Sequence, residues 1–387
     1  MPPLLTLLAF ANLVIGSGAF LVSSIVAPIA EDLGASVPAA GQAMTAYAIS
    51  TAALAPAVLI ATGRWPRRHA LLATLALFFA GNVVCALAPH LAVLLAGRVL
   101  MGLGAAFTPI AAGIAIALVE PARRGKALAY VFLGMSLSYV IGVPLGAWIG
   151  LAWGWRWPIA GVALATLVLM VLVARKVPRD VQAPGASFAG LGPLLTHGPV
   201  LWPLAMTLLY FTAIFSVFSY IGPVLEALNP MTPTLLSVTL ALFGVSGAVG
   251  TVIGGWANDR FGSRRTLVVQ LAILAAMMAC VPLTQGSYPL TLAAFLVWGT
   301  AGFGMMAPQQ SRLAVAAGPQ APLALSLNTS MLYGGTAVGA AVGGAASATV
   351  GFAHMAWIGV PFALAGLATL MFGRPSAPAL DRPLETP

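Results

Sequence analysis

The stretch GGWANDRFGSRR, residues 254–265, decides how the rest of this chain is interpreted. It places one aspartate and three arginines between two long apolar runs, in a chain where only 6% of residues are charged. A weaker copy, GRWPRRH, occupies residues 63–69, again between two apolar runs. A motif repeated at about half the chain length indicates internal duplication. In so apolar a chain, duplication favours a transporter built from two repeats.

The composition excludes a soluble globular protein. The 387 residues are 60% hydrophobic, whereas soluble domains carry about a quarter charged residues. The net charge of +9 is scattered through short turns, so we expect membrane lipid around the chain and no nucleic-acid partner. Cys85 and Cys280 lie in apolar runs of opposite halves. We therefore expect no disulfide, no metal site and no cofactor.

Turn and charge signals divide the chain into twelve apolar runs, each near the roughly 20 residues that cross a bilayer as a helix. We predict an all-α integral membrane protein with twelve transmembrane helices in two pseudo-symmetric six-helix bundles. The bundles are residues 1–174 and 201–373, with a cytoplasmic linker at 175–200 and a cytoplasmic tail at 374–387. The predicted spans are 5–28, 38–61, 70–88, 92–117, 127–150, 157–174, 201–225, 233–256, 266–284, 290–314, 322–345 and 353–373.

Lysine and arginine predict the orientation of these spans. With the N-terminus inside, 14 of the 17 basic residues fall in cytoplasmic loops or the tail. Only Arg156 falls in an outside loop, while Arg98 and Arg312 lie within spans. The positive charge therefore reports topology, and we expect a multi-pass protein of the cell (inner) membrane with both termini in the cytoplasm.

Small residues recur at every fourth position of the fifth and eleventh predicted spans. The two ridges are Ser138, Gly142, Gly146 and Gly150, and Gly335, Gly339 and Gly343. This spacing puts each ridge on one helix face, where a neighbouring backbone approaches closely. We interpret Gly142, Pro144, Gly146, Gly335 and Gly339 as a helix-packing hinge. Plain helix packing without a hinge is the alternative.

These features resemble the major facilitator superfamily. The turn at 255–265 is close to its loop signature, and Arg98 with Gly102 and Gly104 resembles its fourth-helix motif. The segment GVPLG at 142–146, followed by GWRW at 154–157, resembles its fifth-helix antiporter motif and the exit from that helix. The chain is most similar to the drug:proton antiporter family, in the arabinose-efflux-permease-like branch. It departs from the family at Gly63 and Pro66 of the first basic turn, and at Ala19, where many relatives carry a carboxylate.

The resemblance implies a central cavity lined by spans 1, 4, 7 and 10. The substrate-binding candidates on these spans are Phe20, Arg98, Tyr210, Phe218, Trp298 and Gln309. An arginine inside a membrane is costly and usually functional. Without an acidic residue in the spans, Arg98 must bond to carbonyls, hydroxyls, water or substrate. The alternatives are a structural Arg98 and aromatic side chains that only fill the core or face lipid.

The basic turns are candidate elements of a cytoplasmic gate. The residues concerned are Arg67, Arg68, Asp259, Arg260, Gly262, Arg264 and Arg265. An anion near a helix N-terminus is favoured by roughly 0.3–1 kcal/mol. We therefore expect Asp259 to act near the start of the eleventh span, in a charged latch that holds the outward-facing state. The alternative is that these charges only retain the loops inside.

The predicted function is secondary active efflux of a small molecule, drug-like or sugar, by alternating access. Glu226 is the candidate proton-coupling residue, since burial raises the pKa of a carboxyl; a solvated loop carboxylate is the alternative. An uncoupled facilitator or importer is the second function considered. The four histidines are dispersed and no acidic pair appears, so we do not expect an enzyme. We expect a monomer.

Overall fold

The computed structural model describes residues 3–120, 123–179, 191–196 and 198–372. Within these ranges the chain is helical, and no strand is present. Eleven helical stretches of the described residues are long and apolar enough to cross a membrane. The 30-residue helix α18, Ala321–Val350, occupies the remaining place in the order. The prediction of an all-α protein with twelve membrane-spanning helices is confirmed.

The first six spans are built from ten helices with short interruptions. They are α1 (Pro3–Phe20), α2 (Val26–Asp32), α3 (Val37–Ile49), α4 (Ala55–Ala61), α5 (Arg67–Ala86), α6 (Leu91–Gly104), α7 (Phe107–Ala117), α8 (Arg124–Leu137), α9 (Val143–Trp153) and α10 (Arg156–Lys176). A 3₁₀ turn, η1 (Leu21–Ser24), follows α1. Two wide π turns, η2 (Ser50–Leu54) and η4 (Ser138–Gly142), interrupt the second and fifth spans. Such turns inside helices frequently mark functional sites.

The last six spans repeat this order with fewer breaks. They are α12 (Gly198–Phe218), α13 (Ile221–Leu228), α14 (Pro233–Phe261), α15 (Ser263–Cys280), α16 (Tyr288–Gly304), α17 (Met306–Ala317), α18 and α19 (Ala356–Phe372). A short helix, α11 (Leu191–Thr196), precedes them, and 3₁₀ turns lie at η5 (Val281–Thr284), η6 (Gly318–Gln320) and η7 (Phe352–His354). The described residues leave out residues 180–190 and 197, which are much of the predicted linker, and the predicted tail at 374–387.

Two predicted boundaries were wrong in an instructive way. The turn at 254–265 is not a loop, because α14 continues to Phe261 and only Gly262 separates it from α15. Gly262 has φ +79°, a conformation that side chains with a Cβ rarely adopt. The seventh span does not extend to residue 225 as one helix, since α12 ends at Phe218 and α13 starts afresh at Ile221.

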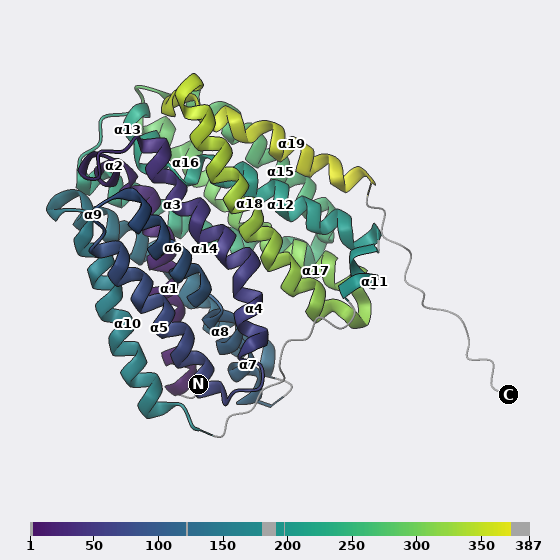
Figure 1. The fold of residues 1–387 in the computed structure, drawn as a ribbon. Helices are drawn as coiled ribbons and strands as arrows, with labels where there is room; N and C mark the ends of the chain where they lie inside the picture. The colour runs from purple at the N-terminus through teal and green to yellow at the C-terminus, as the bar shows by residue number, and fades with distance from the viewer. Residues whose placement is uncertain (1–2, 121–122, 180–190, 197, 373–387) are drawn as a thin grey trace.

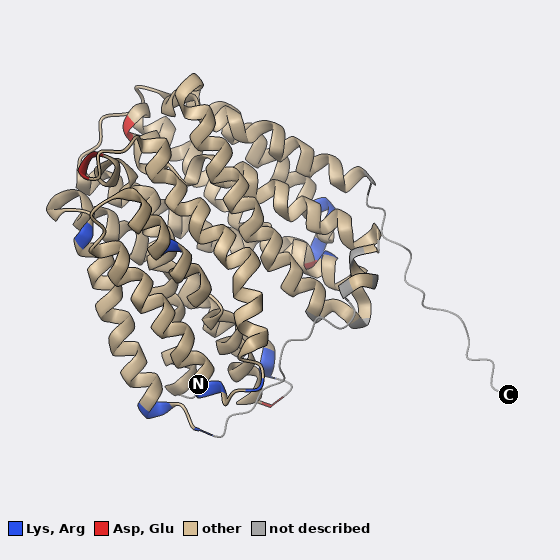
Figure 2. Ribbon diagram, in the orientation of Figure 1, with Lys and Arg blue, Asp and Glu red and all other residues tan. Residues whose placement is uncertain are grey.

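The helices form two bundles that pack against each other (Figure 1). Across the boundary, α3 packs on α18, and α14 packs on η4 and α9. The bundles converge where α2 and α13 lie and diverge toward the ends that carry most of the Lys and Arg (Figures 1 and 2). The acidic residues of α2 and α13 lie at the convergent end (Figure 2). The inter-bundle surface is therefore the place to look for a site.

Candidate functional site

A layer of aromatic rings lies between the two bundles. Phe20, at the end of α1, stacks on Tyr139 of η4 with ring centroids 4.9 Å apart, and lies 5.9 Å from Phe215 of α12. Tyr139 also meets Phe218 of α12 at 5.8 Å and Phe303 of α16 at 5.0 Å. Spans 1 and 5 of the first bundle thus share one cluster with spans 7 and 10 of the second. We call these five residues the aromatic layer.

The aromatic layer has a dry side and an accessible side. Phe20, Phe215 and Phe218 are buried, whereas Tyr139 and Phe303 are only half-buried. A second inter-bundle contact lies between Tyr47 of α3 and Tyr333 of α18, whose ring centroids are 6.1 Å apart. The Tyr47 hydroxyl is buried, with the hydroxyls of Thr51 and Tyr333 beside it. Hydroxyl groups from both bundles therefore meet at this contact.

Arg98 is fixed by main-chain carbonyls. Its Nη1 donates to the Gly18 carbonyl at 2.8 Å, and its Nη2 donates to the Ala19 carbonyl at 2.6 Å. Its Nε donates to the Ala43 carbonyl at 3.0 Å. Gly18 and Ala19 form the last turn of α1, where carbonyls lack helical partners and carry partial negative charge. The guanidinium therefore caps α1 and ties it to α3 from α6.

The Arg98 side chain is only 1% exposed. Its guanidinium carbon lies 4.7 Å from the centre of the Tyr47 ring, within cation–π range. The sequence left carbonyls, hydroxyls, water and substrate as possible partners of Arg98. In the structure, backbone carbonyls surround this arginine. Its influence on a ligand would pass through Tyr47, which it holds beside the bundle boundary.

The second bundle carries four of the predicted substrate residues: Tyr210 and Phe218 on α12, Trp298 on α16 and Gln309 on α17. Phe218 belongs to the aromatic layer, and the other three do not. Tyr210 donates its hydroxyl to the Gly302 carbonyl. Trp298 is 1% exposed and packs on Phe243 and Phe295, and its Nε1 has no hydrogen-bond partner among the described residues. These side chains lie behind the aromatic layer rather than within it.

Gln309 belongs to a polar cluster that joins three spans. Its Nε2 donates to the Pro203 carbonyl and, at 2.9 Å, to the Thr207 hydroxyl, which in turn donates to Asn328 Oδ1 at 2.6 Å. The first bundle has a counterpart, in which Thr108 donates to Asn12 Oδ1 at 2.8 Å. These hydrogen bonds join spans 7, 10 and 11 in one bundle and spans 1 and 4 in the other.

The convergent end is held by side chains that cross or brace the boundary. Tyr220, between α12 and α13, donates to the Ala340 carbonyl of α18 at 3.0 Å. It also packs against Gly41 of α3, where an added Cβ would fall 2.0 Å from the ring. On Gly222 of α13, an added Cβ would fall 2.4 Å from the Ser24 carbonyl oxygen of η1. This end of the boundary is therefore closed.

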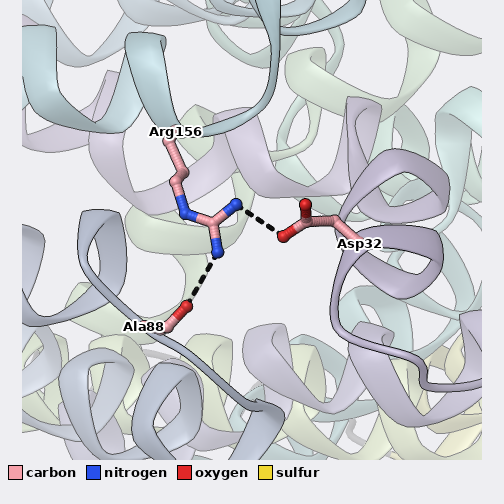
Figure 3. A network of polar contacts seen from close by, with 3 residues as sticks. All are labelled: Asp32, Ala88 and Arg156. Atoms are coloured by element: carbon pink, nitrogen blue, oxygen red, sulfur yellow. Dashed lines mark hydrogen bonds and ion pairs between the residues drawn. The ribbon is translucent and has the colours of Figure 1, made fainter.

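Arg156, the basic residue predicted outside the membrane, braces the same end of the first bundle (Figure 3). Its Nη1 contacts Asp32 Oδ2 at 2.5 Å, and its Nη2 donates to the Ala88 carbonyl at 2.9 Å. The hydrogen bond from Arg156 lowers the pKa of the Asp32 carboxyl. The pairing gives Arg156 a local structural role at the end opposite the basic turns.

The predicted gate residues lie at the divergent ends. Arg67 is buried and donates to the Gly63 carbonyl at 3.4 Å, while Arg68 is half-buried. Arg264 donates to the Leu370 carbonyl of α19 at 3.2 Å. Asp259 is exposed, accepts a hydrogen bond from Asn258, and forms no ion pair with any described residue. A latch between Asp259 and the start of α18 is not formed in this conformation and stays a prediction.

The two glycine ridges pack inside the bundles. An added Cβ on Gly142 would fall 1.8 Å from Ser17 Oγ of α1, and Gly146 lies over Leu21. An added Cβ on Gly335 would fall 2.3 Å from the Leu208 carbonyl of α12, and one on Gly339 would fall 2.7 Å from the Thr212 carbonyl. Pro144 lies in the first turn of α9, which begins at Val143 directly after η4. The ridges join spans 5 to 1 and 11 to 7, so they permit close packing; their role as a hinge stays a prediction.

Glu226 lies on α13 at the convergent end, with its side chain exposed. Partial desolvation by neighbouring protein atoms raises the pKa of its carboxyl. It is not part of the aromatic layer, so its coupling role also remains a prediction.

Four aromatic residues at this boundary were not among the predicted site residues: Tyr139, Phe215, Phe243 and Phe303. A signal was present, because Phe211, Phe215 and Phe218 follow one another at spacings of four and three and so share a helix face. Phe243 of α14 lies 5.9 Å from both Phe218 and Phe303. The aromatic contacts therefore also include the eighth span, in addition to spans 1, 5, 7 and 10.

Comparison with known proteins agrees with this architecture. A profile of the Major Facilitator Superfamily matches residues 8–321. The inner membrane transport protein YdhP of Escherichia coli K12 is 31% identical over 371 residues, covering 95% of this chain and 94% of that protein. A probable sugar efflux transporter of Mannheimia succiniciproducens is 27% identical over 354 residues, covering 91% and 89% of the two chains.

Solved structures show the same fold. The crystal structure of a D-xylose-proton symporter matches with a TM-score of 0.79 at 16% identity, over 96% of this chain and 97% of the other. The xylose transporter XylE of E. coli, in a partially occluded inward open conformation, matches with a TM-score of 0.74 at 15% identity, over 95% and 96% of the two chains.

Proposed function

Because this chain belongs to the Major Facilitator Superfamily, we propose that it exports a small, uncharged or weakly charged amphipathic molecule by alternating access between its two bundles. The proposal rests on the aromatic layer. Its rings come from both bundles, so a ligand bound there would contact both and would respond to their relative movement. An apolar surface with a few polar groups suits a drug-like compound or a sugar derivative.

The charges around the layer narrow the substrate class. No acidic residue lies near the aromatic layer in the described ranges; those present are Glu31, Asp32, Glu120, Glu226 and Asp259. A strongly cationic substrate would therefore lack a counter-ion. The hydroxyls of Tyr47, Tyr139 and Tyr333 supply hydrogen bonds, and their rings supply stacking surface. A ring-shaped substrate with hydroxyl or amide groups fits these contacts best.

The conformation supports alternating access with the convergent end as the closed gate. Tyr220 and Gly222 close that end, while the bundle ends with the basic turns lie apart (Figure 1). With the orientation predicted from Lys and Arg, this is an inward-facing state. An unpaired Asp259 is then consistent with a latch that forms only when the cytoplasmic ends close.

Inside-out vesicles test the proposal directly. Purified protein is reconstituted into the vesicles, and candidate antibiotics and sugars are added outside. The vesicles should accumulate one class of compound, and Tyr139→Ala should abolish that uptake. Trp148→Ala, which removes an exposed aromatic outside the layer, should leave uptake unchanged. Equal loss in both variants, or no loss in Tyr139→Ala, would remove the aromatic layer as the binding site.

An uncoupled facilitator or importer is the second candidate, and one observation favours it. The described spans hold no acidic residue other than Asp259 in the last turn of α14. Glu226 is the remaining candidate for coupling, outside the spans. Substrate-dependent proton movement, measured with a pH-sensitive dye in the same vesicles, separates the candidates. Coupling through Glu226 requires that Glu226→Gln stop proton movement, whereas a facilitator shows none in the native protein.

A further inference from the structure

The outer face of the second bundle contains a groove of about 640 Å³ between α14, α15 and α16. It begins at the basic turn and continues along α15 from Arg265 to Ile273, about 12 Å at 1.5 Å per residue. Its walls include Ile253, Phe261 and Val297, all exposed apolar side chains. The groove therefore opens toward the hydrocarbon region and not toward the aromatic layer.

Two groups give the groove a polar end. Arg265 lines its mouth, is exposed, and forms no hydrogen bond or ion pair with a described residue. Arg260 has its guanidinium carbon 5.8 Å from the centre of the ring of Phe261, which itself lines the groove. The groove therefore has Arg265 in its lining, and Arg260 lies near it through Phe261, at the turn between α14 and α15.

A third group lies deeper in the groove. Gln270 lines it, is 7% exposed, and its Oε1 has no hydrogen-bond partner among the described residues. The amide lies against Gly304 of α16, where an added Cβ would fall 2.4 Å from Nε2. An amide left unpaired in an apolar wall costs free energy, and a ligand that enters the groove can relieve that cost.

We infer that this groove binds one anionic phospholipid, phosphatidylglycerol in type, with its phosphate at Arg265 and an acyl chain along the apolar walls. Basic pockets between transmembrane helices bind anionic headgroups. The glycerol hydroxyls and ester groups of such a lipid offer both donors and acceptors to Gln270. The lipid would brace α14 against α15 and α16 at the turn that carries Asp259. The inference is independent of what the protein transports.

Native mass spectrometry of the intact protein, released from nanodiscs of equal phosphatidylglycerol and phosphatidylcholine, tests the inference. The native protein should retain phosphatidylglycerol in preference. Arg265→Gln should lower that retention about five-fold, the effect of one surface arginine on an anionic lipid. Ala257→Phe, which fills the groove from α14, should lower the retention of both lipids.

Arg68→Gln is the matched control, since Arg68 lies in the corresponding basic turn of the first bundle and does not line this groove. Its retention of phosphatidylglycerol should equal that of the native protein. Equal retention of the two lipids by the native protein, or equal losses in Arg265→Gln and Arg68→Gln, would overturn the inference. Because Arg265 is exposed, its replacement should not impair folding.

Discussion

Corresponding positions of the two bundles carry opposite chemistry. Arg98 stands four residues before Gly102 in the fourth span, and Trp298 stands four residues before Gly302 in the tenth. Both side chains are 1% exposed. Arg98 donates to two carbonyls at the end of α1 and to one carbonyl of α3. The N–H of Trp298 instead has no hydrogen-bond partner among the described residues, and its ring packs among aromatic rings. Duplication preserved the backbone and let each bundle acquire its own interior.

We expect the largest difference between the bundles in the free energy of unfolding that is lost when these two side chains are replaced. Arg98→Ala leaves three carbonyls without their donor, and we expect a loss of at least about 3 kcal/mol of unfolding free energy. Trp298→Phe removes an N–H that bonds to no described residue, and we expect a loss within about 1.5 kcal/mol. Denaturation in mixed micelles measures both. A smaller loss in Arg98→Ala than in Trp298→Phe would contradict the capping role of the arginine.

The glycine ridges provide the next comparison. Gly335→Val should cost more than Gly142→Val, because the first meets the Leu208 carbonyl and the second meets a serine side chain. Overpacking of this kind costs roughly 1–3 kcal/mol. Thermal unfolding in detergent ranks the variants. Adding Ser17→Gly to Gly142→Val should restore part of the lost stability. A failure to do so would show that the Ser17 side chain is not what the added side chain at position 142 clashes with.

The basic turns differ in one carboxylate, since Asp259 in the second corresponds to Gly63 in the first. Asp259→Asn should lower transport about two- to five-fold, the range given by 0.3–1 kcal/mol of anion–helix interaction. Its melting temperature should not change, because the side chain is exposed and unpaired in this state. Vesicle uptake and thermal unfolding, with Glu31→Gln as control, check both statements. Native transport in Asp259→Asn would discard the latch.

The smallest effect concerns the convergent end of the first bundle. Arg156 lowers the pKa of Asp32, so the pair stabilises the folded state above the unfolded pKa of the carboxyl. That stability is lost as the pH falls through the lower, folded pKa. The side chains are 41% and 45% exposed, so Asp32→Asn should lower the melting temperature by only about 1–2 °C at neutral pH. The difference from native protein should shrink below pH 4; a constant difference would exclude the ion pair as its cause.

The span pattern was predictable because hydropathy and charge act locally along the chain. The position of the break after Phe218 was missed, although Gly222 and Pro223 signal an interruption of the helix nearby. Tyr220, which contacts α3 and α18, lies in this break. The hydrogen-bond partners of Arg98 could not be predicted from the sequence. Two of its three acceptors are carbonyls at the end of α1, and no sequence pattern distinguishes those from carbonyls inside a helix.

The candidate site was predictable in part. Phe20 and Phe218 were identified from the spans expected to line a cavity, and both belong to the aromatic layer. Tyr210 and Trp298 lie behind it, since the rotation of each helix about its axis decides which side chain faces the partner bundle. The lipid groove was invisible because its walls come from three helices whose apolar residues look like any other lipid-facing surface.

Two spin-label distances in nanodiscs test the pivoting of the bundles most directly. One pair would replace Trp65 and Trp256 near the divergent ends, and the other Glu31 and Pro230 at the convergent end, in a protein lacking Cys85 and Cys280. With the substrate found in the vesicle screen, the account predicts that the first distance shortens while the second lengthens. Distances that stay constant, or that change in the same direction, would contradict it.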